Sequence, residues 1–299
     1  MHQQLTLSEV LDSNKLVIVD SSVVDFKYRY PRCFLAVNDY AHLRENMLDS
    51  FIEDFQKMTQ IFKHPNTTTI HEVSDEIRRP LVTLEKMSRR IKSRVGISRG
   101  RIKLDDKLKL SREAIQEAYN AARSSELPLL DPKYETLVDI LKLTNSAFGF
   151  DLHDGQWKKD ISLVGRTRAF HGPRLSKDTD ERLAAALMYN LIYSDKTPVL
   201  VSRDADFINL LRDSIGIMSA GCFMAENIEL ADAVRNKNFR FYFGINGVWG
   251  LRAHRNMVRE YNAAMINRRL GENSKAYFAE MRSLWERFSY YPVLQTQAV

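Results

Sequence analysis

Four acidic residues stand where predicted strands end or predicted helices begin. Asp20 closes the apolar run LVIVD, and Asp204 comes two residues after the apolar run VLVS, so both follow predicted buried strands. Asp180 falls in the first turn of the helix predicted for TDERLAAAL, and Glu76 follows the predicted strand TTTIHEV at a helix start. In open α/β sheets, ligands bind at the carboxyl ends of the strands. We therefore expect the four carboxylates to converge at this edge of the sheet.

Each of these acids also has a purely structural explanation. Carboxylates favour helix N-termini, because they cap free N–H groups and complement the helix dipole. Asp178, with Glu181 three residues later, has the spacing of a capping box and is interpreted mainly as a cap. Capping explains any one acid, but it explains less well why acids recur in this order at strand ends and helix starts.

A cluster of carboxylates requires a cation. Close negative charges raise one another's pKa unless positive charge is nearby. Mg²⁺ prefers carboxylate and water oxygens as ligands. Two such ions, about 3.5–4 Å apart, activate a water and stabilise the leaving oxygen in phosphodiester hydrolysis. The acids therefore predict metal-dependent hydrolysis that needs no Ser-His-Asp set.

The segments LVIVDSS, TTIHEVSDEI, TDERLAAAL and VLVSRDADF resemble the ordered motifs of PIN-domain nucleases. The resemblance covers about 1–80 and 175–245. It implies that Asp20, Glu76, Asp180 and Asp204 are the catalytic carboxylates. It also implies that the cofactor is Mg²⁺ or Mn²⁺, with Asp20, Asp180 and Asp204 as ligands of the main ion.

The last motif contributes two more residues, and the glutamate has two candidates. Asp206 matches the second acid of the D-x-D-F motif and is expected to help hold a second ion. Ser202 matches the Ser or Thr that precedes this motif and is expected to assist substrate binding. Glu72 competes with Glu76, and we prefer Glu76 because E-I followed by basic residues fits the family better.

A basic segment lies between the second and third motifs. The stretch 78–109 contains twelve Lys or Arg residues against three acids, in a chain with a net charge of +6. Phosphate contacts come mainly from such residues, although a solvated helix face is the structural alternative. The predicted phosphate-binding residues are Arg89, Arg90, Lys92 and Arg94. The resemblance makes RNA the expected polymer rather than DNA.

Strands that alternate with helices predict an α/β fold. The resemblance implies a three-layer PIN-like fold, with a central, mainly parallel sheet flanked by helices and a helical insertion. The expected nuclease domain is 1–250, with a basic, mostly helical insertion at about 81–170. A C-terminal helical extension is expected at 251–299.

Local patterns predict the individual elements. Helices are expected at about 38–62, 111–125, 137–143 and 178–194, and a further helix, broken near Pro80, at about 74–95. Strands are expected at 16–20, 67–73, 197–202, 216–218 and 239–243, with a turn at 96–100. Two amphipathic helices are expected within about 253–290, separated at Gly271, with Ser274 as an N-cap.

Other features of the sequence concern cellular location, the cysteines and protein partners. No apolar run approaches the roughly 20 residues of a membrane span, and the first residues do not form a secretory signal, so a cytoplasmic protein without membrane contact is expected. Cys33 and Cys222 are expected to be reduced and structural. The C-terminal helices are candidates for contact with a protein partner or a second copy of the chain.

The residues together predict a metal-dependent nuclease, and the resemblance implies an endoribonuclease. The alternative is a non-catalytic nucleic-acid-binding or scaffold protein on a PIN-like fold. A phosphatase with an aspartyl nucleophile normally requires D-x-D after the first strand, whereas this chain has Asp20-Ser21-Ser22. The chain is also longer than expected for a toxin of a toxin–antitoxin pair.

Overall fold

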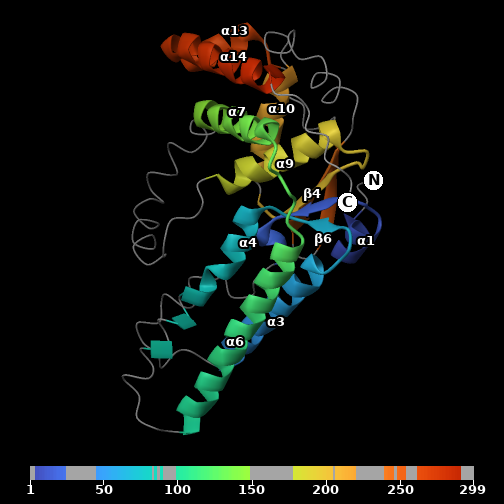
Figure 1. Ribbon diagram of the computed structural model, residues 1–299, viewed down its shortest axis with the longest axis vertical. Coiled ribbons are helices and arrows are strands. Elements are labelled where there is room, and N and C mark those ends of the chain that lie inside the picture. Colours follow the sequence, from blue (N-terminus) through green and yellow to red (C-terminus); the bar gives the residue numbers. More distant parts are fainter. Residues whose placement is uncertain are drawn as a thin grey trace. The chain divides into compact units, whose positions relative to one another are not determined.

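The computed structural model divides the chain into two compact units (Figure 1). Unit 1 contains Met1–Ile18, Pro128–Gly155 and Asp178–Val299, and unit 2 contains Val19–Leu127 and Gln156–Lys177. Each unit has its own buried apolar residues and therefore its own core. The structure describes residues 4–24, 45–82, 84–85, 88–89, 99–148, 178–204, 206–219, 239–245, 248–253 and 261–290.

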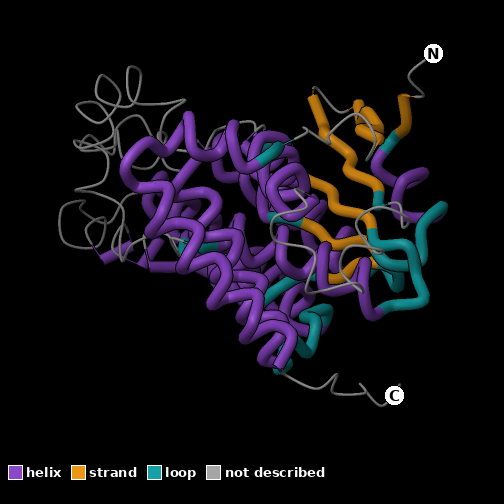
Figure 2. The backbone as a smooth tube through the Cα atoms, turned by 90° about the horizontal axis from the view of Figure 1, so that it is seen from above, coloured by secondary structure: helices purple, strands orange, loops and turns teal. Residues whose placement is uncertain are grey.

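Unit 1 is built on a mixed β-sheet, whose strands are orange in Figure 2. Its strand order is β1 (Gln4–Leu5), β6 (Val248–Ala253), β5 (Arg240–Ile245), β4 (Val199–Ser202) and β2 (Val17–Val19). β4 pairs with β5 in parallel, whereas β6 pairs antiparallel with both β5 and β1. With its helices, this sheet confirms the predicted α/β class.

β2 and β4 form where the sequence predicts buried strands. All residues of both strands are buried, as continuous runs of Val, Ile and Leu predict. The backbone N–H of Val199 donates to the carbonyl of Leu16 at 2.9 Å, which joins β4 to the segment that enters β2. The last residue of β2, Val19, already belongs to unit 2. Each strand delivers its predicted acid to its carboxyl end.

Unit 1 also contains helices and a short 3₁₀ turn. They are α1 (Leu7–Asp12), α7 (Pro132–Phe148), α9 (Thr179–Tyr193), α10 (Asp206–Ser219), α13 (Ala263–Leu270), the 3₁₀ turn η5 (Gly271–Asn273) and α14 (Ser274–Tyr290). α14 packs on α7, because Arg287 pairs with Asp139 and the Lys133 ammonium lies 5.0 Å from the ring centre of Phe288. The predicted pair of C-terminal helices, separated at Gly271, is confirmed.

The start of α7 is fixed by a buried carboxylate. Asp131 Oδ1 accepts a hydrogen bond from the backbone N–H of Lys133 at 2.8 Å, and Pro132 occupies the first helical position. The other oxygen, Oδ2, accepts from the hydroxyl of Tyr189 at 2.7 Å. Desolvation by burial, followed by this hydrogen bond, raises the pKa of Tyr189. The neutral tyrosine is therefore part of the folded state of unit 1.

Stability is expected to fall at alkaline pH because of Tyr189. The pKa of a tyrosine in the unfolded chain is about 10, and the pKa of Tyr189 in the folded protein is higher. The contribution of neutral Tyr189 to the free energy of unfolding is therefore fully present below about pH 10 and is lost as the pH rises toward the folded pKa. Urea unfolding between about pH 8 and about pH 11 would measure this slope. Tyr189→Phe should make it shallower, whereas Tyr290→Phe, at a residue 84% exposed, should not. An unchanged slope in Tyr189→Phe would contradict the expectation.

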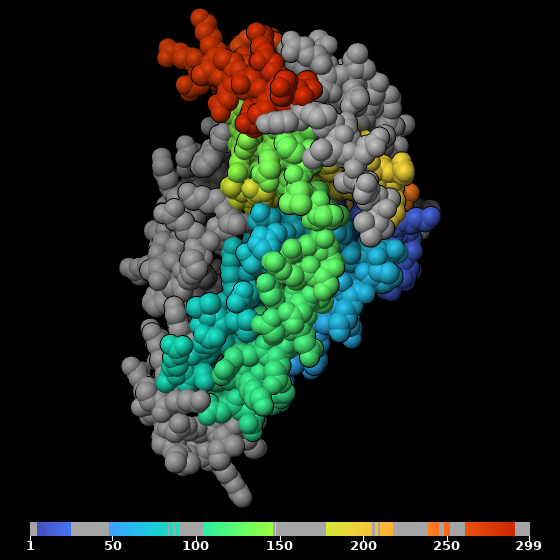
Figure 3. Space-filling model, in the orientation of Figure 1, coloured from blue at the N-terminus to red at the C-terminus, as the bar shows by residue number. Residues whose placement is uncertain are grey.

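Unit 2 is mainly helical. It contains the 3₁₀ turn η1 (Ser21–Val23), α3 (Glu45–Phe62), the short strand β3 (Thr67–Thr68), α4 (His71–Arg78) and α6 (Arg99–Ser124). Figures 1 and 3 show α3 and α6 lying side by side. In the buried face of α3, the ring centres of Phe51 and Phe55 lie 4.7 Å apart, with the rings tilted by 53°. The hydroxyl of Thr69 donates to the carbonyl of Val19 at 2.8 Å, which holds β3 beside the end of β2.

Several predicted boundaries are wrong. The predicted strand 67–73 ends at Thr68, and α4 begins at His71, so Glu72 and Glu76 both lie on α4. The predicted strand 216–218 lies within α10, because Phe207, Leu210, Leu211 and Ile215 bury one helical face. The strand-like pattern in each case covers only a few residues. It is outweighed by the helical spacing of apolar residues over the longer segment that contains it.

Other differences are extensions or omissions. The predicted turn at 96–100 ends in helix, because α6 begins at Arg99 rather than at 111, and it ends at Ser124. Ser274 is the first residue of α14 rather than an N-cap that precedes it. β1, β6 and α1 were not predicted, although Thr6 and Glu9 form a complete capping box at the start of α1. Within the described ranges, no helix is long and apolar enough to cross a membrane.

Candidate functional site

Asp20 lies directly at the end of β2 and is buried, with an exposed fraction of only 5%. It occupies the N-cap position of η1, but its side chain makes no capping hydrogen bond there. Instead, Oδ2 accepts from the hydroxyl of Ser22, and Oδ1 lies 3.4 Å from the hydroxyl of Ser21. The carboxylate is therefore held by hydroxyl groups rather than used to start a helix.

Ser21 connects Asp20 to Glu76. Its hydroxyl oxygen lies 2.8 Å from Glu76 Oε2 and 3.4 Å from Asp20 Oδ1. A hydroxyl carries one proton, and the shorter distance assigns that proton to Glu76. Asp20 and Glu76, which are 56 positions apart in the sequence, are thus both within reach of one hydroxyl group within unit 2.

Helix α4 places Glu76 rather than Glu72 against Ser21. The two glutamates lie one turn apart on the helix, and both are half-buried. Val73 and Ile77, which are buried, anchor α4 in the core of unit 2 and fix its rotation. Glu76 also lies near Arg79, whose Nη1 is 3.8 Å from Oε1. This carboxylate therefore has a hydroxyl donor on one oxygen and a cation near the other.

Ser202 is the last residue of β4, and Asp204 follows it two positions later in unit 1. Ser202 is fully buried, and its hydroxyl oxygen accepts from the backbone N–H of Asp204 at 3.0 Å. The guanidinium of Arg203 lies 5.6 Å from the ring centre of Trp249. Asp204 itself is half-buried. Because the Ser202 hydroxyl accepts the backbone N–H of Asp204, the chain can leave β4 through an acidic residue without a glycine.

Asp180 lies in the first turn of α9 and is half-buried. The capping box expected from Asp178 and Glu181 does not form. Asp178 occupies the N-cap position without a side-chain capping bond and pairs with Lys142 at 2.6 Å, while Glu181 is buried and accepts from the amide of Asn145. Lys142 and Asn145 of α7 bind these two carboxylates, so neither carboxylate caps the start of α9.

The structure thus brings together two of the predicted site residues, Asp20 and Glu76, within unit 2. Asp180 and Asp204 lie in unit 1, and their convergence with the first pair stays a prediction. Asp206 is the first residue of α10, and its side chain lies outside the described residues. Arg89 is exposed in unit 2, whereas Arg90, Lys92 and Arg94 lie outside the described residues.

The donor atoms at Asp20 and Glu76 suit a hard divalent cation. Both offer carboxylate oxygens, and Mg²⁺ is commonly bound through one or two carboxylates while it keeps several waters. Among the residues that the structure describes, no group of three or more His, Cys, Asp or Glu side chains is placed to hold a metal. The pair therefore fits Mg²⁺ or Mn²⁺ chemically as a two-carboxylate site, not as a closed protein cage.

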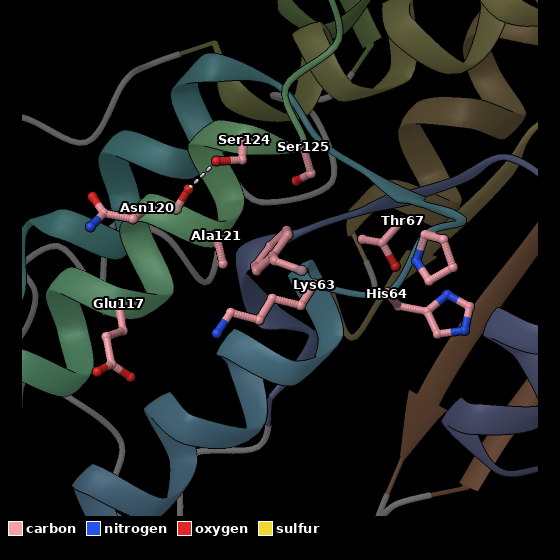
Figure 4. Close-up of a pocket in the computed structure, with 10 residues that line it drawn as sticks. Lys63, His64, Thr67, Glu117, Asn120, Ala121, Ser124 and Ser125 are labelled. Carbon is pink, nitrogen blue, oxygen red and sulfur yellow. Dashed lines mark hydrogen bonds between the residues drawn. The ribbon is translucent and has the colours of Figure 1, made fainter.

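A separate hollow of about 640 Å³ lies in unit 2 (Figure 4). The end of α3, the turn before β3 and the last turns of α6 line it, with Lys63, His64 and Glu117 among the lining residues. Neither Asp20 nor Glu76 is part of this lining. The hollow is therefore distinct from the carboxylate pair and adds no group to it.

A comparison with known protein families, curated proteins and solved structures found no match to this chain. The function must therefore be argued from the residues.

Three residues of the carboxylate site were not singled out from the sequence. Ser21 and Ser22 follow Asp20 directly, and Arg79 stands three positions after Glu76, a spacing that places Glu76 and Arg79 on one side of a helix.

Proposed function

We propose that this protein is a metal-dependent nuclease that hydrolyses phosphodiester bonds in RNA, on a three-layer PIN-like fold. The observation that carries the proposal is the buried carboxylate of Asp20, held at a strand end and joined through Ser21 to Glu76. Hard divalent cations prefer carboxylate oxygens as ligands. A site that keeps two carboxylates close together is suited to cation-assisted chemistry.

Asp20 and Glu76 would hold the cation, and the resemblance assigns Asp180 and Asp204 to the same role. The ion would activate a water and stabilise charge on the leaving oxygen. Ser22 fixes the Asp20 carboxylate and Ser21 fixes that of Glu76, so both groups are oriented before substrate binds. Burial of Asp20 keeps bulk water from screening its charge.

RNA is the proposed substrate because the resemblance points to it and because unit 2 carries basic residues. Arg89 is exposed and is available for phosphate contact. Such contacts bind the backbone without reading its sequence. Specificity for a particular RNA would have to come from other groups.

Cleavage of labelled single-stranded RNA and DNA tests the proposal. The wild-type protein should cut RNA in Mn²⁺ or Mg²⁺, should stop cutting in EDTA, and should lose activity in Asp204→Asn. Faster cutting of DNA would keep the hydrolase and change the substrate. If the protein binds both strands but cuts neither with any metal, the nuclease proposal fails and the non-catalytic nucleic-acid-binding alternative replaces it.

A further inference from the structure

Arg79 stands at the edge of the Asp20–Glu76 pair. It is the C-cap residue of α4, and its Nη1 lies 3.8 Å from Glu76 Oε1. Its side chain is 27% exposed. Glu76 is in turn hydrogen-bonded to Ser21, which adjoins Asp20. The positive charge of Arg79 therefore belongs to the same cluster as the two carboxylates.

The guanidinium of Arg79 is only partly satisfied. Nη1 is buried and makes no hydrogen bond in the part of the chain that the structure describes, because the distance to Glu76 is that of an ion pair without a bond. An arginine has five N–H donors, and a buried donor without an acceptor is unfavourable. A small movement of this side chain would allow it to meet an incoming acceptor while its charge stays beside Glu76.

The chemistry of the proposed substrate supplies such an acceptor. A phosphodiester carries a negative charge, and the two carboxylates repel it as it approaches. A guanidinium matches the geometry of phosphate oxygens and binds them with charge-assisted hydrogen bonds. We propose that Arg79 binds a phosphate oxygen of the nucleic-acid strand at the Asp20–Glu76 pair, an inference that rests on the proposed nuclease function.

The neighbouring arginine offers a matched comparison. The guanidinium of Arg78 lies 5.3 Å from the ring centre of Tyr119 on α6, and the residue is exposed. Arg78 and Arg79 are thus adjacent in sequence and equal in charge, but only Arg79 is placed beside Glu76. Non-specific attraction of RNA to a basic surface would use both residues equally, whereas the proposed role distinguishes them.

Steady-state cleavage of single-stranded RNA in Mn²⁺ by full-length Arg79→Ala, Arg79→Lys and Arg78→Ala tests the role. Arg79→Ala should raise KM by about tenfold or more, the effect of losing a hydrogen bond between charged groups. Arg79→Lys should recover part of the loss, and Arg78→Ala should stay near wild type. The salt dependence of RNA binding should become shallower by about 0.7 in slope for Arg79→Ala, as for one lost phosphate contact on a single strand.

Binding of Mn²⁺ without RNA gives a readout that a merely structural role would not produce. Removal of a positive charge beside Glu76 should make Arg79→Ala bind Mn²⁺ more tightly than wild type, while Arg78→Ala should be unchanged. Partial unfolding would weaken metal binding, so tighter Mn²⁺ binding with weaker RNA binding cannot come from misfolding.

The possible failures are distinguishable. If wild type cuts RNA but Arg79→Ala and Arg78→Ala have equal KM and equal Mn²⁺ affinity, the role of Arg79 is overturned and the nuclease proposal stands. If wild type binds RNA without cutting it, the nuclease proposal fails, and Arg79 keeps its role only if Arg79→Ala selectively weakens that binding. Absence of RNA binding by the wild type would overturn both.

Discussion

Asp20→Asn is expected to lower the rate of metal-dependent RNA cleavage by at least about a hundredfold, the scale seen when one preorganised electrostatic contact is removed. The substitution removes the negative charge and keeps the shape. Ser21 and Ser22 contact the carboxylate oxygens of Asp20, and a hydroxyl can accept a hydrogen bond as well as donate one. Both hydroxyls can therefore adapt to an amide, and the free energy of unfolding should change by no more than about 1 kcal/mol.

Asp54→Asn is the matched control. Asp54 has the same exposed fraction as Asp20, 5%, and lies in the same unit, but it pairs with the exposed Lys57 of α3 at 3.3 Å. Cleavage rate, Mn²⁺ affinity and urea unfolding should be measured for both variants. Asp20→Asn should lose cleavage and Mn²⁺ binding, whereas Asp54→Asn should keep both. Equal activity of the two variants would remove Asp20 from the proposed site.

The elements that could be predicted from sequence are those in which one physical signal acts alone. β2 and β4 consist of Val, Ile and Leu, apart from Ser202 at the end of β4, with no competing period, and both are fully buried. α9 has buried residues around most of its circumference and an acidic first turn. By contrast, residues 216–218 look like a strand locally and become helical, because the apolar spacing of α10 extends over a longer range.

The residues of the candidate site also fall into those that local patterns predict and those that depend on tertiary contacts. Strand ends and helix starts indicated which acids to examine, because these positions follow from local patterns. The choice between Glu72 and Glu76 depended on something else, since both lie on one helix one turn apart. The contact that distinguishes them is the hydroxyl of Ser21, which reaches Glu76 across 55 residues. No local pattern encodes such a contact, and the same holds for the partners that take Asp178 and Glu181 away from the start of α9.

The division into two units was also beyond local patterns. It passes through β2 between Ile18 and Val19, in the middle of a continuous apolar run. A linker rich in Pro, Gly or polar residues would have indicated a boundary, but here the chain changes units inside a strand. The predicted limits at 250 and 251 and at about 81–170 follow from the family resemblance and stay predictions.

Trp249→Ala is expected to destabilise the protein by about 3–5 kcal/mol, the usual cost of truncating a large buried aromatic residue. Trp249 is 2% exposed in β6 and lies opposite Gly244 of β5. A Cβ atom at Gly244 would lie 2.8 Å from the Trp249 ring, so the indole fills the space that the glycine leaves. Loss of the ring would open a cavity that the strands cannot close.

Val248→Ala is the control for Trp249→Ala, because Val248 is the neighbouring residue of β6 and is 41% exposed. Urea unfolding should show a small change for Val248→Ala, within about 0.5 kcal/mol, and a large one for Trp249→Ala; similar midpoints would mean that β6 unfolds before the core.

The indole also lies under the guanidinium of Arg203, the residue between Ser202 and Asp204. Trp249→Ala should therefore reduce cleavage at temperatures where the variant is still folded, because the turn that carries Asp204 loses its support.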